Sequence, residues 1–332
     1  MSPGADLNCR PFPYQGSALP TELPGRDKII LPYRGRIETM ARKKLLLLKI
    51  KKKDRVLIIA PHPDDDVLGA GGLMAYFLDK KIFFKVIYIC TGDGVPAFLW
   101  REKKFKFSPE NYIGVGNLRR KEALRGLKML GADSNKAIFL GYSDGCLLPM
   151  WKNPQKTIIG SRTRLTFSPY SFAYTENQEF KGVNLLADLI SIFRQEKPTM
   201  VLAPHLKSGH LDHRAAFSFT KKVLEKVNFK GQLFEYLTSL GLIKLHGFLG
   251  IGSLIKIYPP KNKKGEANVL YPPTTLSQNK QWVSFWLSPD QIKKKQAALQ
   301  AHQSQWGLPT LRRAFRSLAA QNEIFQKNGG FN

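Results

Sequence analysis

Polar side chains suited to hold a metal ion follow a strongly apolar segment near residue 60. Residues 56–60 read Val-Leu-Ile-Ile-Ala, a run that predicts a strand buried on both faces, as in a parallel sheet. The segment after this strand holds two prolines, one histidine and three aspartates: Pro61, His62, Pro63, Asp64, Asp65 and Asp66. Adjacent carboxylates repel one another, and a bound cation removes that repulsion. His62 with Asp65 offers one nitrogen and one oxygen, a donor pair that suits zinc.

The same acids have two other interpretations. Aspartates are favoured at helix N-termini, so they would also suit a solvated turn that caps the apolar helix expected over residues 73–78. Gly69, Gly71 and Gly72 invite comparison with a dinucleotide-binding loop. Acids stand where the pyrophosphate would bind, however, and the G-x-G-x-x-G order is absent, which disfavours that loop.

A second polar cluster follows another predicted strand. Residues 199–203 form a short apolar segment that stops at Pro204, and three of the six histidines of the protein come soon after it: His205, His210 and His213. His210 and His213 lie three residues apart at the start of an amphipathic helix, so both can face one point above the sheet. The repetition of this arrangement favours one metal site shared by the two clusters.

These donors describe a catalytic metal site. Three protein ligands with one open position are typical of catalytic zinc, which lowers the pKa of water and polarises a carbonyl. A free carboxylate beside the ligands can take a proton from water, and a histidine can steady an oxyanion or protonate a leaving amine. The chemistry predicted is hydrolysis of an amide or an ester.

The elements that must position these residues alternate between strand and helix. Further strands are expected over residues 85–90, 137–140 and 233–240, and helices over 117–130, 183–196 and 288–305, with an irregular excursion over 146–180. This rhythm predicts an α/β protein with a Rossmann-like, doubly wound, mainly parallel sheet and helices on both faces. Such sheets bind ligands at the carboxyl ends of their strands, where both polar clusters lie.

We divide the chain into an N-terminal basic extension, residues 1–53, and one domain, residues 54–332. Residues 42–53 combine four leucines with basic flanks, which predicts a helix that packs on the domain or lies on an anionic membrane. Residues 241–258 are apolar and glycine-rich, and we expect a hairpin there, with membrane contact as the alternative.

The charge of the protein indicates an anionic partner. Its 332 residues include 52 Lys and Arg against 25 Asp and Glu, a formal net charge of +27. Three cysteines far apart in sequence predict no disulfide framework, residues 1–16 lack a secretory signal, and no apolar run is long enough to span a bilayer. We therefore expect a cytoplasmic protein, with peripheral attachment to the inner face of a membrane as a variant of that location.

The two polar clusters resemble the LmbE/PIG-L family of zinc-dependent N-deacetylases. The family marks are a strand followed by (A/P)-H-P-D-D and a later H-x-D-H, here Pro61 to Asp65 and His210 to His213. Weaker matches are an R-x-x-E helix, an Asp-Gly loop and a K-x-x-A-L-x-x-H-x-S-Q helix, here Arg119 with Glu122, residues 142–145 and residues 295–305. The resemblance covers residues 54–306 and not the N-terminal extension.

The resemblance implies a metal centre with a general base. His62, Asp65 and His213 would be the metal ligands, with Zn²⁺ as the metal and Fe²⁺ as the alternative. Asp64 would be the general base that deprotonates the attacking water.

The resemblance also implies roles around that centre. His210, oriented by Asp212, would act as electrophile or acid, and Arg119 and Asp144 would contact sugar hydroxyls. The substrate would be an N-acetylglucosamine-type conjugate, small or lipid-linked, and the positive charge of the protein suggests that this conjugate is anionic.

Some positions depart from the family pattern. Asp66 replaces the usual glutamate, and Ser208 stands where some members have a tyrosine, so an oxyanion donor is missing there. His210 would then carry more of that task, or Tyr142 or Tyr236 would replace the missing donor. His205 is an additional histidine, which we interpret as a turn residue.

A second class of function remains open from composition. A basic protein that binds nucleic acid or a membrane surface, with a vestigial metal site, would explain the lysine excess. No zinc finger, groove-reading helix or basic segment interleaved with aromatic residues occurs in the sequence, which disfavours nucleic acid.

Overall fold

A computed structural model describes residues 46–94, 108–238, 240–243, 254–256, 269–273, 276 and 281–329. The chain divides into two units, residues 1–43 and 44–332, and all described residues belong to the second. In this part of the chain eight strands form one sheet, in the order β1-β9-β10-β6-β5-β2-β3-β4. Their bounds are β1 Leu46–Leu47, β2 Arg55–Ala60, β3 Phe83–Cys90, β4 Ala137–Tyr142, β5 Met200–Pro204, β6 Gln232–Tyr236, β9 Trp282–Trp286 and β10 Asn322–Lys327.

Most of the sheet is parallel, as the sequence predicts. Strands β4, β3, β2, β5 and β6 pair in parallel, whereas β10 runs antiparallel to both β6 and β9. A separate pair, β7 (Leu240–Ile243) with β8 (Leu254–Lys256), is antiparallel, which agrees with the hairpin expected over residues 241–258. The residues that join β7 to β8 lie outside the described ranges.

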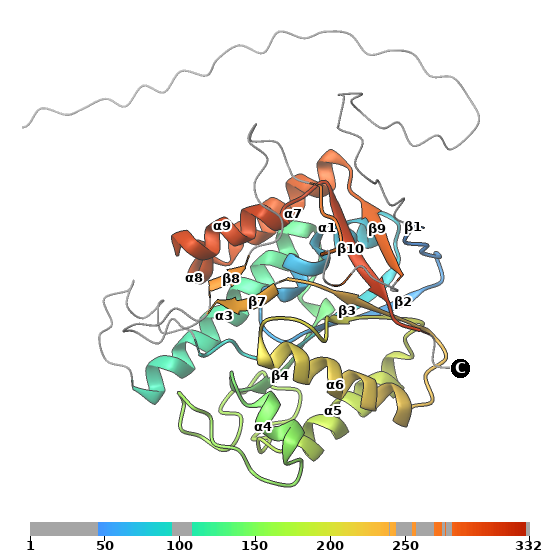
Figure 1. The fold of residues 1–332 in the computed structure, drawn as a ribbon. Coiled ribbons are helices and arrows are strands. Elements are labelled where there is room, and N and C mark those ends of the chain that lie inside the picture. The colour runs from blue at the N-terminus through green and yellow to red at the C-terminus, as the bar shows by residue number, and fades with distance from the viewer. Residues whose placement is uncertain are drawn as a thin grey trace, which may run out of the picture. The chain divides into compact units, whose positions relative to one another are not determined.

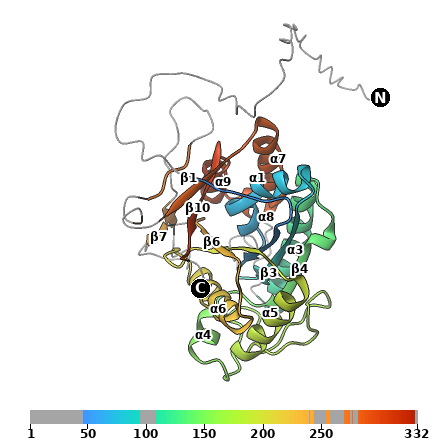
Figure 2. The same ribbon diagram turned by 90° about the vertical axis from the view of Figure 1, so that its right-hand side faces the viewer.

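Helices cover both faces of the sheet (Figures 1 and 2). One layer contains α1 (Asp65–Asp79), α3 (Pro109–Leu130), α7 (Pro289–Ala301), α8 (Gln303–Trp306) and α9 (Pro309–Leu318). The opposite layer contains α4 (Leu147–Lys152), α5 (Gly182–Glu196) and α6 (Leu211–Lys226), and a 3₁₀ turn, η1, spans Ser134–Lys136. Alternate residues of β2 enter two separate cores: Val56, Ile58 and Ala60 in the first, Leu57 and Ile59 in the second. The doubly wound fold predicted from sequence is therefore confirmed.

Local sequence signals set the helix ends. Ser108 caps α3 through its hydroxyl, which accepts from Asn111 N, and Gly131 ends that helix in the left-handed region at φ 98°. At α7 the Ser288 hydroxyl and the Gln291 side chain form a reciprocal capping box. A helix starting at Ser288 was predicted, but it breaks at His302 instead of continuing to residue 305.

The two polar clusters predicted to hold a metal follow neighbouring strands. From β2 the chain winds through β3 and β4 on one side, and β5 then returns to the other side of β2, where Ile58 pairs with Leu202. This reversal is the topological switch point of an open α/β sheet, where such folds bind ligands. The turns after β2 and after β5 therefore meet at one edge.

The buried ion pair of Lys295 with Glu323 stabilises a break in helix α1. Ala70 has non-helical dihedrals (φ −145°, ψ 21°), which leaves backbone groups of the helix without their usual partners. The Glu323 carboxylate accepts from Gly72 N at 2.8 Å and Leu73 N at 2.9 Å, while Lys295 Nζ donates to Leu68 O at 3.1 Å. Lys295 and Glu323 also pair with one another at 2.7 Å, so α7 and β10 together hold both halves of α1.

Residues 46–48 differ from their predicted structure. The helix expected over residues 42–53 is wrong for the described part, because Leu46 and Leu47 form an edge strand that pairs in parallel with β9. Leu48 is buried in the first core. A short leucine run fits a strand as well as a helix, and the partner strand, far away in sequence, decides between them.

Candidate metal centre and active site

Asp65 lies between two histidines at the switch point. Its Oδ2 is 3.2 Å from His62 Nδ1 and 3.1 Å from His213 Nε2. His62, Asp65 and His213 are all buried, and the two histidines hold the pKa of Asp65 well below its usual range against the opposing effect of burial. The structure thus brings the three predicted metal ligands together as one carboxylate and two imidazoles.

His210 is a fourth donor at the same point. Ring nitrogens of His62, His210 and His213 all lie within 4.8 Å of one another. His210 is exposed whereas the other two are buried, so it faces the solvent side of the cluster. The geometry therefore allows three histidines and one carboxylate to compete for the ligand positions.

Both buried histidines have a polar partner for their second ring nitrogen. His62 Nε2 is 3.4 Å from Asp212 Oδ2, and His213 Nδ1 is 3.0 Å from Ser208 Oγ. Metal-binding histidines commonly have such a partner, which fixes the ring and leaves the other nitrogen for the ion. The donor set and its supports therefore fit a Zn²⁺ or Fe²⁺ ion held by His62, Asp65 and His213.

Asp64 carries a carboxylate that the three ligands do not use. Its backbone has φ 154°, a conformation that residues other than glycine rarely adopt and that is often found at functional sites. Burial raises the pKa of Asp64 to about 7, against the opposing effect of Arg119, whose Nη2 lies 3.1 Å from Asp64 Oδ2. A carboxyl group with this pKa can exchange a proton near neutral pH.

Arg119 is buried and anchors the turns around Asp64. Its guanidinium donates to Gly92 O at 3.2 Å and to Pro63 O at 3.0 Å, besides the ion pair with Asp64. Gly92 has φ 74°, and Arg119 occupies the space where a side chain at this position would begin. The predicted contact of Arg119 with sugar stays a prediction.

The C-terminal helices reach the same arginine. With its amide turned so that the oxygen faces the guanidinium, Gln305 accepts from Arg119 Nη2 and Nε. Glu122, one turn after Arg119 on α3, accepts from Ser304 N at 2.7 Å and from Ser304 Oγ at 2.6 Å. The R-x-x-E and H-x-S-Q segments thus contact each other, which sequence alone did not predict.

Asp144 lies beside the metal cluster. Its Oδ2 accepts from Gly94 N at 3.1 Å, and its Oδ1 is 3.7 Å from His62 Nε2. Asp93, buried next to it, accepts from Ser143 Oγ and Asp144 N, and burial followed by Asp144 raises the pKa of Asp93 to about 7. Sequence reasoning missed Asp93, although Gly92-Asp93-Gly94 directly follows a strand as the ligand turns do.

Asp212 does not orient His210 through its carboxylate in this structure. Its oxygens accept from Gly145 N at 2.7 Å and Leu147 N at 3.2 Å, and Oδ2 faces His62. The contact with His210 runs the other way, since Asp212 N donates to His210 Nδ1 at 3.2 Å at the start of α6. The Asp212 carboxylate therefore supports the His62 side of the cluster.

The two tyrosines considered as replacement oxyanion donors, and the additional histidine, have hydrogen-bond partners outside the metal cluster. Tyr142 OH donates to Asp188 and Tyr236 OH donates to Ile59 O, so neither hydroxyl is directed to the metal cluster. His205 is buried, lies 2.9 Å from Gln326 Oε1 and accepts from Lys207 N, which agrees with the predicted turn residue.

Asp66 is directed away from the cluster as well. Its Oδ2 accepts from Tyr88 OH at 2.7 Å, and burial raises its pKa to about 7. Asp66 therefore has its hydrogen-bond partner in the neighbouring strand β3, whereas Asp64 and Asp65 face the histidines and Arg119.

Comparison with known proteins gives a family. The family model described as PIG-L, GlcNAc-PI de-N-acetylase, matches residues 57–224, half of the chain. No curated protein matches. A conserved protein of Thermus thermophilus is 19% identical over 83% of this chain and 95% of that one, with a TM-score of 0.46. The N,N'-diacetylchitobiose deacetylase of Pyrococcus horikoshii is 20% identical over 83% and 84%, with a TM-score of 0.45. A deacetylase of the teicoplanin biosynthetic pathway is 15% identical over 82% and 97%, with a TM-score of 0.47.

Proposed function

The chain belongs to the PIG-L family of deacetylases, and we propose that it removes the acetyl group from an N-acetylglucosamine-type conjugate by metal-assisted hydrolysis. The observation that carries the proposal is the arrangement at the switch point. Asp65 lies between His62 and His213, while the neighbouring Asp64 remains outside this triad with a pKa of about 7.

Each side chain then has a task in amide hydrolysis. The chemistry that zinc supplies in such a site is Lewis acidity, which makes water more acidic and polarises a carbonyl. Asp64 accepts a proton from the attacking water, whose oxygen forms a bond to the carbonyl carbon. The carbon–nitrogen bond breaks, the amine nitrogen takes that proton from Asp64, and acetate leaves. Burial lowers the pKa of His210 to about 3, so its neutral ring would act as a hydrogen-bond donor to the oxyanion. Arg119 keeps the Asp64 carboxylate in place.

The test is release of acetate from a panel of N-acetylglucosamine conjugates. We expect Asp64→Asn to lower kcat by a factor on the order of 10² to 10⁴, because a general base is lost while the ligands stay. The bound metal per chain, measured by elemental analysis, should equal that of the unsubstituted protein. Asp133→Asn changes an exposed aspartate by the same atoms and serves as the control. Full activity of Asp64→Asn, or full activity after removal of metal, would overturn the proposal.

The substrate and its location follow from charge as parts of the same proposal. A net charge of +27 favours an anionic conjugate, whose capture should weaken as salt rises. Among the described helices none is long and apolar enough to cross a bilayer. An anionic conjugate on a membrane lipid would bring the protein to that membrane from the cytoplasmic side, whereas a soluble conjugate would not.

The competing function is a basic binding protein with an inactive metal site. The lysine excess favours this competing function. The two buried histidines disfavour it, because each ring has a hydrogen-bond partner that holds it in position to bind a metal. Duplex DNA and anionic vesicles, each added at low and at high salt, separate the two functions. Salt-sensitive binding without acetate release from any conjugate would favour the competing function.

A further inference from the structure

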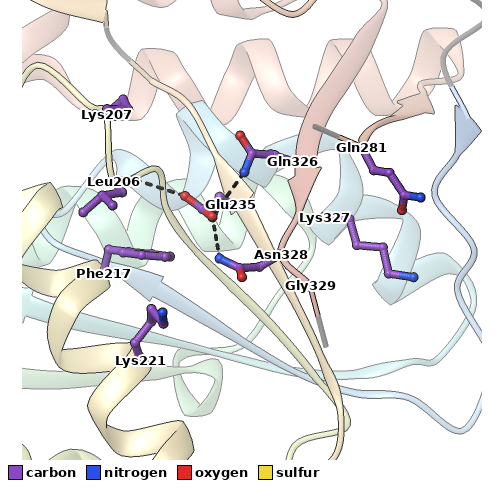
Figure 3. A pocket seen from close by; sticks show the side chains of 10 residues that line it. All are labelled: Leu206, Lys207, Phe217, Lys221, Glu235, Gln281, Gln326, Lys327, Asn328 and Gly329. Atoms are coloured by element: carbon purple, nitrogen blue, oxygen red, sulfur yellow. Dashed lines mark hydrogen bonds between the residues drawn. The ribbon is translucent and has the colours of Figure 1, made fainter. Parts of the chain in front are cut away.

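A hollow separate from the metal cluster lies beside the loop that follows β5. It has a volume of about 620 Å³, within the size range of ligand sites, and its walls come from that loop, from α6, from β6 and from the end of β10 (Figure 3). The loop separates it from the metal cluster: Leu206 and Lys207 line the hollow, and the next residue, Ser208, contacts the ligand His213.

Three lysines dominate the charge of this hollow. Lys207, Lys221 and Lys327 line it from three different elements, and all three are exposed. Figure 3 shows them on different sides of Glu235, the one acid among the lining residues. Within the described ranges none of the three ammonium groups has a carboxylate partner.

The carboxylate of Glu235 is already satisfied by the protein. Glu235 is only 3% exposed, its Oε2 accepts from Leu206 N at 3.1 Å, and its Oε1 accepts from Asn328 Nδ2 at 2.7 Å and Gln326 Nε2 at 3.4 Å. These bonds, drawn as dashed lines in Figure 3, hold the carboxylate in place. Three lysines against this one acid leave a formal charge of +2 on the lining residues, so a ligand that enters the hollow meets net positive charge.

We propose that this hollow binds the phosphate group of a phosphorylated ligand. Lysine ammoniums suit a group with two or more negative charges, because each acts as a point charge and donates several hydrogen bonds. Leu206, 44% exposed, and Phe217 provide an apolar wall for the remainder of the ligand. The phosphate is carried either by a lipid headgroup or by a soluble compound.

The binding test uses two probes on the full chain: inorganic pyrophosphate by calorimetry, and sedimentation with phosphatidylcholine vesicles that contain or lack phosphatidate. The pocket variant is Lys207→Gln, Lys221→Gln and Lys327→Gln together. The control variant is Lys80→Gln, Lys128→Gln and Lys152→Gln, which removes the same charge from exposed lysines outside the hollow.

We expect the dissociation constant to rise on the order of tenfold or more in the pocket variant and to change little in the control. Binding of vesicles alone would assign the phosphate to a lipid headgroup, and binding of pyrophosphate alone to a soluble ligand. An equal loss in both variants would show a general effect of charge and overturn the proposal, as would failure of both probes to bind the unsubstituted protein.

The metal cluster needs its own control, since phosphate can also coordinate a metal ion. His213→Asn removes a candidate ligand without touching the lysines, so pyrophosphate binding should persist in this variant. Loss of binding there, with no further loss in the pocket variant, would place the phosphate at the metal centre and overturn the proposal. Because binding is measured without turnover, the outcome does not depend on the deacetylase activity.

Discussion

His62 and His213 differ from His210 in how much of each residue the solvent can reach. The first two are 7% and 5% exposed and have Asp212 and Ser208 beside their second nitrogens, whereas His210 is exposed. A fixed imidazole suits a ligand, and an accessible one suits contact with an incoming substrate. Burial thus separates residues that sequence spacing alone treats as equals.

Metal content tests this division at the level of single residues. We expect His213→Ala to reduce the bound metal strongly, because one of three ligands is lost, and His210→Ala to retain it while kcat falls. Both substitutions remove the same atoms at the start of α6, so each is the control for the other. Equal loss of metal in the two variants would make His210 a metal ligand and contradict this division.

A pH effect on stability belongs to Asp93. Burial, and then Asp144, raises its pKa to about 7 in the folded protein, while an unfolded aspartate titrates near pH 4. Between about pH 4 and pH 7 the folded state holds the extra proton, so this group lowers the free energy of unfolding as pH rises. Asp93→Asn should gain stability relative to the unsubstituted protein across that window, measured by urea unfolding. A difference that does not vary with pH would contradict this assignment.

Some residues of the site could be predicted from the sequence, but most of their hydrogen-bond partners could not. A metal site shared by the two clusters was predicted because two strand ends carried the same residue types, and strand ends of a parallel sheet share an edge. The choice of His62, Asp65 and His213 as its ligands came from the family resemblance, and the structure places these three side chains together. The hydrogen bonds that Asp212 makes with Gly145 and Arg119 makes with Gly92 were not predicted, because they involve backbone groups of the two glycines. Backbone partners leave no residue type in the sequence by which to recognise them.

At the scale of elements, the broken helix α1 depends on residues far along the chain. Glu323 on β10 accepts from Gly72 N and Leu73 N, and Lys295 on α7 neutralises that carboxylate. Asp64 and Asp65 begin the first half of this helix, so the break and its support fix the direction in which the turn after β2 enters α1.

Removal of Lys295 should therefore be costly for stability. Lys295→Met leaves Glu323 as a buried unpaired charge, and we expect the free energy of unfolding to fall by about 3–5 kcal/mol. The neighbouring Lys294, whose pairs with Asp79 and Asp290 lie at the surface, provides the control: Lys294→Met should change it by about 1 kcal/mol or less. Chemical denaturation measures both, and a similar small effect for the two lysines would show that the pair does not support α1.

Element boundaries were predictable where one residue type decides them. Ser288 and Gly131 mark a helix start and a helix end, and the structure has them there. The break at His302 and the strand at Leu46 were not predicted. Both depend on packing against distant elements, since α8 meets Glu122 through Ser304 and β1 pairs with β9.

At the scale of the whole molecule, the metal cluster gathers buried acids that repel one another. Asp64, Asp65 and Asp212 are each at most 9% exposed, and Arg119 is the buried arginine that pairs with one of them. A divalent cation bound by the folded state alone stabilises that state by mass action.

Chelation should then lower the melting temperature. With metal at 100 times its dissociation constant the native state gains about 2.7 kcal/mol, which corresponds to a shift on the order of 5 °C for a domain of this size. Differential scanning calorimetry with and without a chelator measures the shift. His213→Ala, which should hold little metal, is the control, and a chelator effect of the same size in that variant would contradict metal binding at this cluster.

The overall architecture was predicted because strand and helix alternate over residues 55–226, the same part that the family model matches. Beyond it the sheet continues through β6, β10 and β9, and β10 runs antiparallel. β10 lies inside the sheet, and both of its partner strands are far away in sequence, so the role of Glu323 could not be foreseen from the residues around it.

The pairing of β2 with β5 makes metal uptake a reporter of correct strand alignment. Ile58 faces Leu202 across this pair, and His62 and the loop to His213 follow the two strands directly. A slip of one residue would shift one turn against the other by about 3.3 Å and turn every side chain to the opposite face. Refolded chains with that error could not gather the donors, so a coloured cobalt complex would distinguish aligned molecules from misaligned ones in a mixture.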